Sequence, residues 1–224
     1  VLWDGSANSA VQKGFEKVDL SGLSTTNGST VIGSSSGDTI TGTAQADTIT
    51  PGLGADSIYH GVGADLIDLT ETTDSADKVY FTTNNANQAP LITGFTANDK
   101  LVLDKTNYSS VPADAAATYT NGTETALHAN DYVEIAGNGT IVAEHVNIIK
   151  THGFADIAAV LASTTETNGH DAIVGFHNTT SGNFEIYDTD TVQTSSTWNL
   201  IASFTDVTAG TAAATFDSAN FVLF

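Results

Sequence analysis

The chain has 224 residues, and its 26 acidic and six basic side chains give a formal net charge of −20. This charge argues against nucleic-acid binding and against docking on anionic lipid, because both need a basic surface. No apolar run approaches the roughly 20 residues of a membrane-spanning helix, so we expect no membrane insertion. The absence of Cys excludes disulfides and thiolate metal sites.

Residues 1–28 are expected to form an N-terminal flank or cap. From Gly33 the sequence divides into four nine-residue rows, GSSSGDTIT, GTAQADTIT, PGLGADSIY and HGVGADLID. The eighth position is always Ile, at the centre of a segment that suits a three-residue strand, and the Gly-rich remainder suits a turn. The sixth position is always Asp, which gives Asp38, Asp47, Asp56 and Asp65.

One Ile per row cannot form a core alone, so the rows must stack with two Ile ladders facing each other. Two rows then make one coil, and successive coils pair as parallel strands about 4.8 Å apart. This stacking places Asp38 above Asp56 on one edge and Asp47 above Asp65 on the other. Two carboxylates at that spacing repel each other by roughly 1 to 3.5 kcal/mol, and no Lys lies within the rows to relieve this. A Ca²⁺ ion would relieve this repulsion, because it prefers carboxylate and carbonyl oxygens as ligands.

The rows resemble the G-G-x-G-x-D-x-U-x nonapeptides of the repeats-in-toxin (RTX) proteins, whose parallel β-rolls bind Ca²⁺. The resemblance implies about two to four ions, each between the aspartates of alternate rows and completed by turn carbonyls. A Ca²⁺-free β-solenoid is the alternative. Carried onto this sequence, the first site comprises Asp38 and Asp56 with the carbonyls of Ser34, Ser36, Pro51 and Leu53; the second comprises Asp47 and Asp65 with Thr43, Gln45, His60 and Val62; the third comprises Asp56 and Asp74 with Gly52, Gly54, Leu69 and Glu71.

Beyond the rows, Lys78–Phe81 is predicted to be a strand that closes a β-roll spanning residues 29–82. Apolar spacing predicts one short helix over residues 153–163. The sequence therefore predicts a mainly β fold, in which a parallel β-roll precedes a β-rich C-terminal domain over residues 83–224. Further strands are expected at 91–95, 98–103, 132–135, 140–149, 169–175, 183–187, 199–204 and 220–224.

No catalytic constellation is recognisable, so we expect no enzyme. The segment Gly33–Gly37 matches G-x-S-x-G around Ser35, but a strand and a turn follow it where a nucleophile elbow needs a helix. Residues 151–224 hold eight acids and no basic residue, and they end in an apolar segment after Asp217. This pattern resembles the uncleaved C-terminal signal of proteins secreted by a type I exporter, here near residues 165–224. The alternative is a last strand buried in the C-terminal domain, and both can hold.

The composition, rich in Thr, Ala, Asn and Gly, also resembles that of Gram-negative surface-layer proteins. These resemblances imply the calcium-binding region of a secreted protein at the surface of a Gram-negative bacterium. Its partners would be a type I exporter during secretion and further copies of itself in a surface lattice. Two alternatives stay open: an adhesin or matrix module, and the non-catalytic export region of a larger secreted hydrolase.

Overall fold

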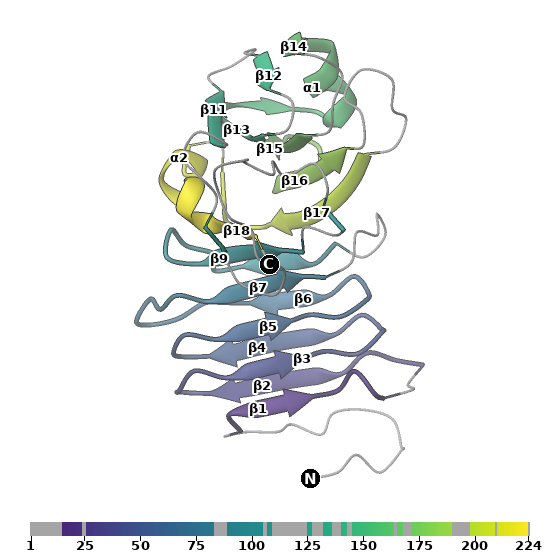
Figure 1. Cartoon of the computed structure of the whole chain (residues 1–224), viewed down its shortest axis with the longest axis vertical. Coiled ribbons are helices and arrows are strands. Elements are labelled where there is room, and N and C mark those ends of the chain that lie inside the picture. Colours follow the sequence, from purple (N-terminus) through teal and green to yellow (C-terminus); the bar gives the residue numbers. More distant parts are fainter. Residues whose placement is uncertain are drawn as a thin grey trace.

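The computed structural model describes residues 15–23, 26–82, 89–104, 107–108, 125–126, 132–135, 140–142, 145–163, 165–167, 172–189, 198–208 and 210–223. Within these residues the protein is mainly β, as predicted. Figure 1 shows short strands stacked in successive coils from β1 to β9, with the longer strands β13, β15, β16 and β17 beyond them. No helix in the described ranges is long and apolar enough to span a membrane.

The described strands form two large sheets and one small one. The first sheet has the order β1 (Lys17–Asp19), β3 (Thr39–Thr41), β5 (Ser57–Tyr59), β7 (Lys78–Phe81), β9 (Lys100–Leu103), β18 (Phe221–Leu223) and β10 (Thr125–Ala126). The second has the order β11 (Tyr132–Ile135), β13 (Val146–Phe154), β15 (Ala172–Asn178), β16 (Phe184–Thr189), β17 (Trp198–Phe204), β8 (Leu91–Thr93), β6 (Leu66–Asp68), β4 (Thr48–Gly52) and β2 (Thr30–Ser34). The small sheet pairs β12 (Thr140–Val142) with β14 (Thr165–Thr167).

The nine-residue rows form the half-coils that the sequence predicts. Ile40 pairs with Ile58 in the first sheet, and Ile49 pairs with Ile67 in the second, both between parallel strands. All four side chains have no exposed surface and belong to one hydrophobic core. The single apolar residue of each row is therefore buried only because two opposing ladders meet.

The parallel ladders extend past both predicted boundaries of the roll, at residues 28 and 82. β1 pairs with β3 below the first row, and β7 carries β9 on its far side, so β7 is a strand as predicted but does not close the roll. Two later strands continue the same sheets: β17 pairs with β8, and the C-terminal β18 pairs with β9, both in parallel. One core therefore runs from the repeats to Phe216 and Phe221 near the C-terminus.

The predicted helix is present but shorter, as α1 (Ile157–Ser163), because Gly153 and Phe154 end strand β13. Phe154 still packs in the same small core as Val160 of the helix, which explains the helix-like spacing of apolar residues. Near the C-terminus, the four-residue α2 (Ala212–Thr215) and the 3₁₀ turn η2 (Ser218–Asn220) lead into β18.

Candidate metal centre

Turns of successive coils lie in direct contact at the edges of the roll. Gly52 and Gly61 have positive φ angles of 111° and 92°, which L-residues with side chains rarely adopt. A Cβ atom at Gly52 would lie 1.9 Å from the Ser34 carbonyl oxygen, and one at Gly61 would lie 2.1 Å from that of Thr43. Glycine at these positions thus brings each turn against carbonyl oxygens of the coil before it.

The first ladder consists of Asp38, Asp56, Asp77 and Asp99, which share one edge of the roll. Each backbone N–H donates to the Oδ1 atom of the next aspartate, from Asp38 to Asp56 at 2.6 Å, from Asp56 to Asp77 at 2.8 Å and from Asp77 to Asp99 at 2.9 Å. All four residues are at most 2% exposed. The predicted stacking of Asp38 and Asp56 is therefore present, and the ladder continues for two further coils.

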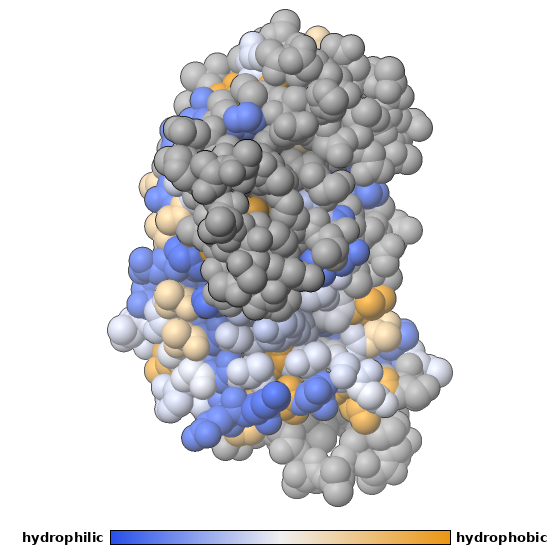
Figure 2. Space-filling view, viewed as in Figure 1, coloured by the Kyte–Doolittle hydropathy of each residue, from blue (hydrophilic) through white to orange (hydrophobic). Residues whose placement is uncertain are grey.

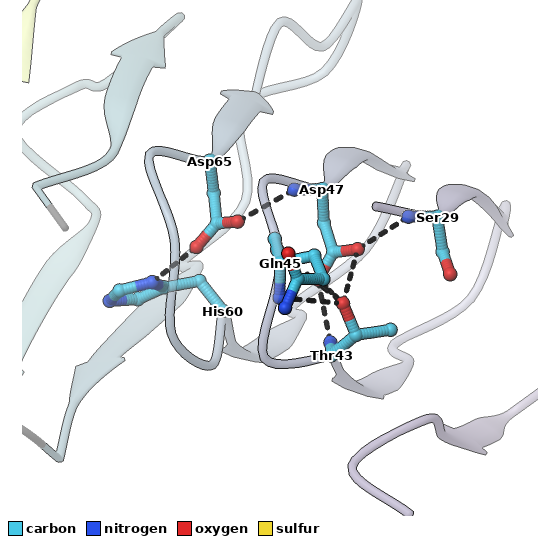
Figure 3. Close-up of polar contacts among 6 residues, drawn as sticks. All are labelled: Ser29, Thr43, Gln45, Asp47, His60 and Asp65. Carbon is cyan, nitrogen blue, oxygen red and sulfur yellow. Dashed lines mark hydrogen bonds and ion pairs between the residues drawn. The ribbon is translucent and has the colours of Figure 1, made fainter. Parts of the chain in front are cut away.

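The second ladder consists of Ser29, Asp47 and Asp65 on the opposite edge (Figure 3). The N–H of Ser29 donates to Asp47 Oδ1 at 2.6 Å, and that of Asp47 donates to Asp65 Oδ1 at 2.7 Å. The remaining oxygens also have protein partners. Asp47 Oδ2 accepts from the Thr43 N–H at 2.6 Å, and Asp65 Oδ2 lies 2.7 Å from Nδ1 of the buried His60.

Asp74, predicted to pair with Asp56, joins neither ladder. It is exposed, and it accepts hydrogen bonds from the Thr96 hydroxyl at 2.9 Å and the Asn98 amide at 2.6 Å. The coil after Asp56 is 21 residues long, compared with 18 for the coil before it. The three additional residues put Asp77 in the place that a strict repeat would give to Asp74.

The residues predicted to supply carbonyl ligands lie in the stacked turns, and several of these carbonyls also take part in hydrogen bonds between or within turns. Leu53 N–H donates to the Ser34 carbonyl at 3.0 Å, and Val62 N–H donates to that of Thr43 at 3.1 Å. The Pro51 and His60 carbonyl oxygens face Gly33 and Gly42, where a Cβ would lie within 2.3 Å of them. The other predicted carbonyl donors are Ser36 and Gln45, whose carbonyls accept from side chains of their own turns; Gly52 and Gly54, in the turn before Asp56; and Leu69 and Glu71.

Three buried oxygens of the first ladder have no hydrogen-bond partner: Asp38 Oδ1, Asp56 Oδ2 and Asp77 Oδ2. Leaving a buried acceptor without a partner costs about 1 to 3 kcal/mol, and more when the group is charged. A hard cation would satisfy these oxygens, so the donor set of the first ladder fits Ca²⁺. The carboxylates of the second ladder need no such partner in this arrangement.

The ionisation of the first ladder also reflects burial. Desolvation raises the pKa of Asp56 to about 6, with further upward contributions from the Asp38 and Glu71 carboxylates. It raises the pKa of Asp77 to about 7, where Asp99, Asp56 and Glu71 add to the effect. Burial and neighbouring negative charge both disfavour the ionised carboxylates. A bound divalent cation would offset these two free-energy costs by its attraction for the ionised form.

Among the described residues, no group of three or more His, Cys, Asp or Glu side chains has the geometry of a metal site. The candidate centre is therefore built from pairs of stacked carboxylates with backbone carbonyls, in a parallel β-roll. The RTX calcium-binding nonapeptide repeat family matches residues 32–67, in four copies. These rows are thus supported as RTX repeats, which implies that they bind calcium. Searches of curated proteins and of solved structures found no match to the chain.

Periodicity alone did not find Asp77 and Asp99. The signal that could have found them is their place directly before a strand, in Asp77-Lys78-Val79 and Asp99-Lys100-Leu101. Asp56-Ser57-Ile58 has the same form, with the aspartate two positions before the buried apolar residue.

Proposed function

We propose that this chain is the calcium-dependent folding and assembly region of an exported surface-layer structural protein, with no catalytic role. The observation that carries the proposal is the row of buried, partnerless carboxylate oxygens at Asp38, Asp56 and Asp77. Without a cation these coils stack against charge repulsion. With Ca²⁺ the binding free energy becomes folding free energy, about 2.7 kcal/mol for each ion at a concentration of 100 times its Kd.

Calcium-dependent folding suits secretion through a type I exporter. In the calcium-poor cytosol the carboxylates repel one another, and the chain stays open for transport. Outside the cell, Ca²⁺ closes the coils. The apolar segment resembling an export signal includes β18, which is buried against β9 in the folded state. An exporter would thus meet that segment only before the chain folds.

Assembly would depend on charge neutralisation more than on apolar contact. On the face shown in Figure 2, hydrophilic and near-neutral residues dominate the roll, and hydrophobic atoms form small separate patches. Leu66 is the one large hydrophobic side chain recorded as exposed in the described ranges. Copies that each carry a net charge of −20 repel one another. Bound Ca²⁺ lowers this repulsion, so self-association should follow calcium.

The test is light scattering and size-exclusion chromatography of the whole chain from zero to about 10 mM Ca²⁺, beyond the range of extracellular calcium modules. We expect ordered self-association that a chelator reverses. A protein that stays monomeric across this range would refute the assembly role. Calcium-dependent retention on cells or polysaccharide without self-association would instead support an adhesin.

A further inference from the structure

The few lysines of this chain are gathered on one surface. The chain has six basic side chains against 26 acidic ones, and four lysines lie in the described ranges. Lys150 is buried and pairs with Glu134. The other three, Lys17, Lys78 and Lys100, lie on strands β1, β7 and β9 of the first sheet. Parallel pairing places them in a single row along the stack of coils in Figure 1, in the order Lys17, Thr39, Ser57, Lys78 and Lys100.

This row lies on the outer face of the roll. The next residue of each strand points inward, and Ile58 and Val79 at that position have no exposed surface. Because side chains alternate along a strand, the lysines point away from the core. Lys17 is exposed, and Lys78 and Lys100 are half-buried. We call this surface, defined by Lys17, Lys78 and Lys100, the lysine face.

Two like charges stand directly opposite each other on the lysine face. Lys78 pairs with Lys100 in register, and like charges in that position destabilise a sheet. Both lysines directly follow a ladder aspartate, Asp77 or Asp99, so compensation of the ladder charge is one explanation. The neighbouring charges that shift the pKa of Asp77 and Asp99 are all acidic, however, so the lysines do not offset the ladder. An acidic group that approaches from outside the chain would relieve the repulsion between them.

A tyrosine flanks the lysines. Tyr59 follows Ser57 by two residues on the same strand, so its side chain lies on the same face. Its ring stacks on that of Tyr80 with 4.0 Å between the ring centroids, and Tyr59 is half-buried whereas Tyr80 is 5% exposed. Tyrosine is enriched in protein–protein interfaces, where it supplies apolar area and a polar tip. The lysine face thus offers positive charge and an aromatic contact together.

The opposite face of the roll has no such charge. On the second sheet, the residues on either side of the buried Ile49 and Ile67 point outward, as do their equivalents in β2 and β8. These outward residues are Thr30, Ile32, Thr48, Thr50, Leu66, Asp68, Leu91 and Thr93. They include an acid, Asp68, and the exposed Leu66, but no lysine. The two faces of the described roll therefore differ in charge.

A second copy of the chain brings the complementary charge, because each copy has a formal charge of −20. Two lysine faces in contact would place cations against cations. Contact between the lysine face and an acidic surface of the next copy is attractive instead. Such a contact joins two different surfaces, so each added copy presents a further lysine face, and the copies form a ring or an open array and not a two-fold dimer.

We infer that the lysine face binds an acidic surface of a second copy, head to tail, and so directs the assembly of this protein. The inference rests on the proposed calcium-dependent self-association and names the surface that carries it. Bound Ca²⁺ lowers the overall repulsion between copies, while the lysines and Tyr59 supply the attraction. Exposed charges are screened beyond about 8 Å at physiological ionic strength, so this attraction acts at contact and weakens with added salt.

The test is sedimentation velocity of the whole chain at saturating Ca²⁺, over a range of protein concentrations. In Lys78→Gln combined with Lys100→Gln, we expect half-association to need a roughly tenfold higher protein concentration, because two interfacial ion pairs are lost. Thr30→Glu combined with Thr48→Glu is the matched control. These exposed residues are paired on neighbouring strands of the second sheet, and the formal charge falls by the same amount. The control should associate as the unaltered chain does.

Unchanged association of the lysine variant, or equal weakening in the control, would overturn the inference. Circular dichroism and equilibrium dialysis of Ca²⁺ show whether each variant folds and keeps its ions. If the lysine variant does not fold, Thr39→Lys decides, since it adds a charge to the row, whereas Thr48→Lys adds one to the identical Thr-Ile-Thr segment of the second sheet. The first should strengthen association and the second should not, and equal effects would refute the proposal.

Two further outcomes separate this inference from its alternatives. If the lysine variant loses binding to polygalacturonate but associates normally, the face binds an acidic glycan and the assignment to a second copy is wrong. If the unaltered chain stays monomeric in Ca²⁺, the proposed assembly role itself fails. Failure of the lysine face alone would instead appear as association of the unaltered chain that the lysine variant retains.

Discussion

Replacing Asp56 by Asn should stabilise the metal-free protein and destabilise the calcium-loaded one. The rise of the Asp56 pKa from 3.8 to about 6 corresponds to a penalty of about 3 kcal/mol on the ionised native carboxylate, at about 1.4 kcal/mol for each tenfold change in proton affinity. The Coulomb repulsion between neighbouring carboxylates about 4.8 Å apart, roughly 1 to 3.5 kcal/mol, has the same size. Asn removes this charge and keeps the acceptor for the Asp38 N–H.

The new amide hydrogens need acceptors, and the contacts of Asn220 with the Ala97 and Asp99 carbonyls show that turn carbonyls of this roll can provide them. We therefore expect a net gain of about 2 to 3 kcal/mol without metal, after a small cost for imperfect pairing. For a chain of this size, that gain raises the melting temperature by roughly 4 to 12 °C.

Calcium should reverse the order of stability. Asp56 stacks between Asp38 and Asp77, so its loss removes a ligand from two candidate sites. At a Ca²⁺ concentration of 100 times each Kd, two lost sites cost about 5 kcal/mol of stabilisation relative to the unaltered chain. Thermal melts followed by circular dichroism at about pH 7.5, with Ca²⁺ from zero upward, should give melting temperatures that cross. Asp68→Asn, an exposed residue outside the ladders, is the control. Melting below the unaltered chain in metal-free buffer, or an unchanged calcium response, would refute this account.

The pKa of Asp77 is about 7 in the native state and near 3.8 when unfolded, so the native state holds the additional proton between these values. The metal-free melting temperature should therefore fall as pH rises from about 4 to 7 and level off above that, and saturating Ca²⁺ should remove the fall. Gly52→Ala should cost at least about 2 to 3 kcal/mol in denaturant unfolding, whereas Gly22→Ala, with nothing within 4 Å, should be nearly neutral; equal effects would contradict the close stacking of turns. Phe221→Ala should cost about 3 to 5 kcal/mol, because Phe221 is 1% exposed in the core shared with the repeats, and a smaller loss would show that β18 is dispensable to the roll.

The sequence predicts the repeats well because their period defines strand, turn and stacking register together. Because every row has the same length, Ile40 is predicted to lie opposite Ile58 in the next coil, and the structure pairs these two residues. The sheet order beyond the repeats has no such signal. Phe204 pairs with Ile92, and Phe221 pairs with Leu101, across long separations in the chain that no local pattern indicates. A local apolar spacing likewise placed Phe154 in a helix, although long-range pairing holds it in β13.

The displacement of Asp74 by Asp77 shows what the stacking conserves. Counting forward in nines assumes that every coil has the same length. In the structure, the constant feature is instead that the ladder aspartate lies two residues before the inward-facing residue, as in Asp56–Ile58, Asp77–Val79 and Asp99–Leu101. A longer turn costs little, since loop-closure entropy grows slowly with length. Moving the Val79 side chain out of the core would cost far more free energy, because it packs in the core ladder next to Ile58. In this chain, the ladder aspartate of the longer coil is therefore located by counting back from its buried residue, Val79. By that rule the aspartate ladder extends beyond the recognisable repeats to Asp77 and Asp99, and Asp74 instead accepts hydrogen bonds from Thr96 and Asn98 of the next turn.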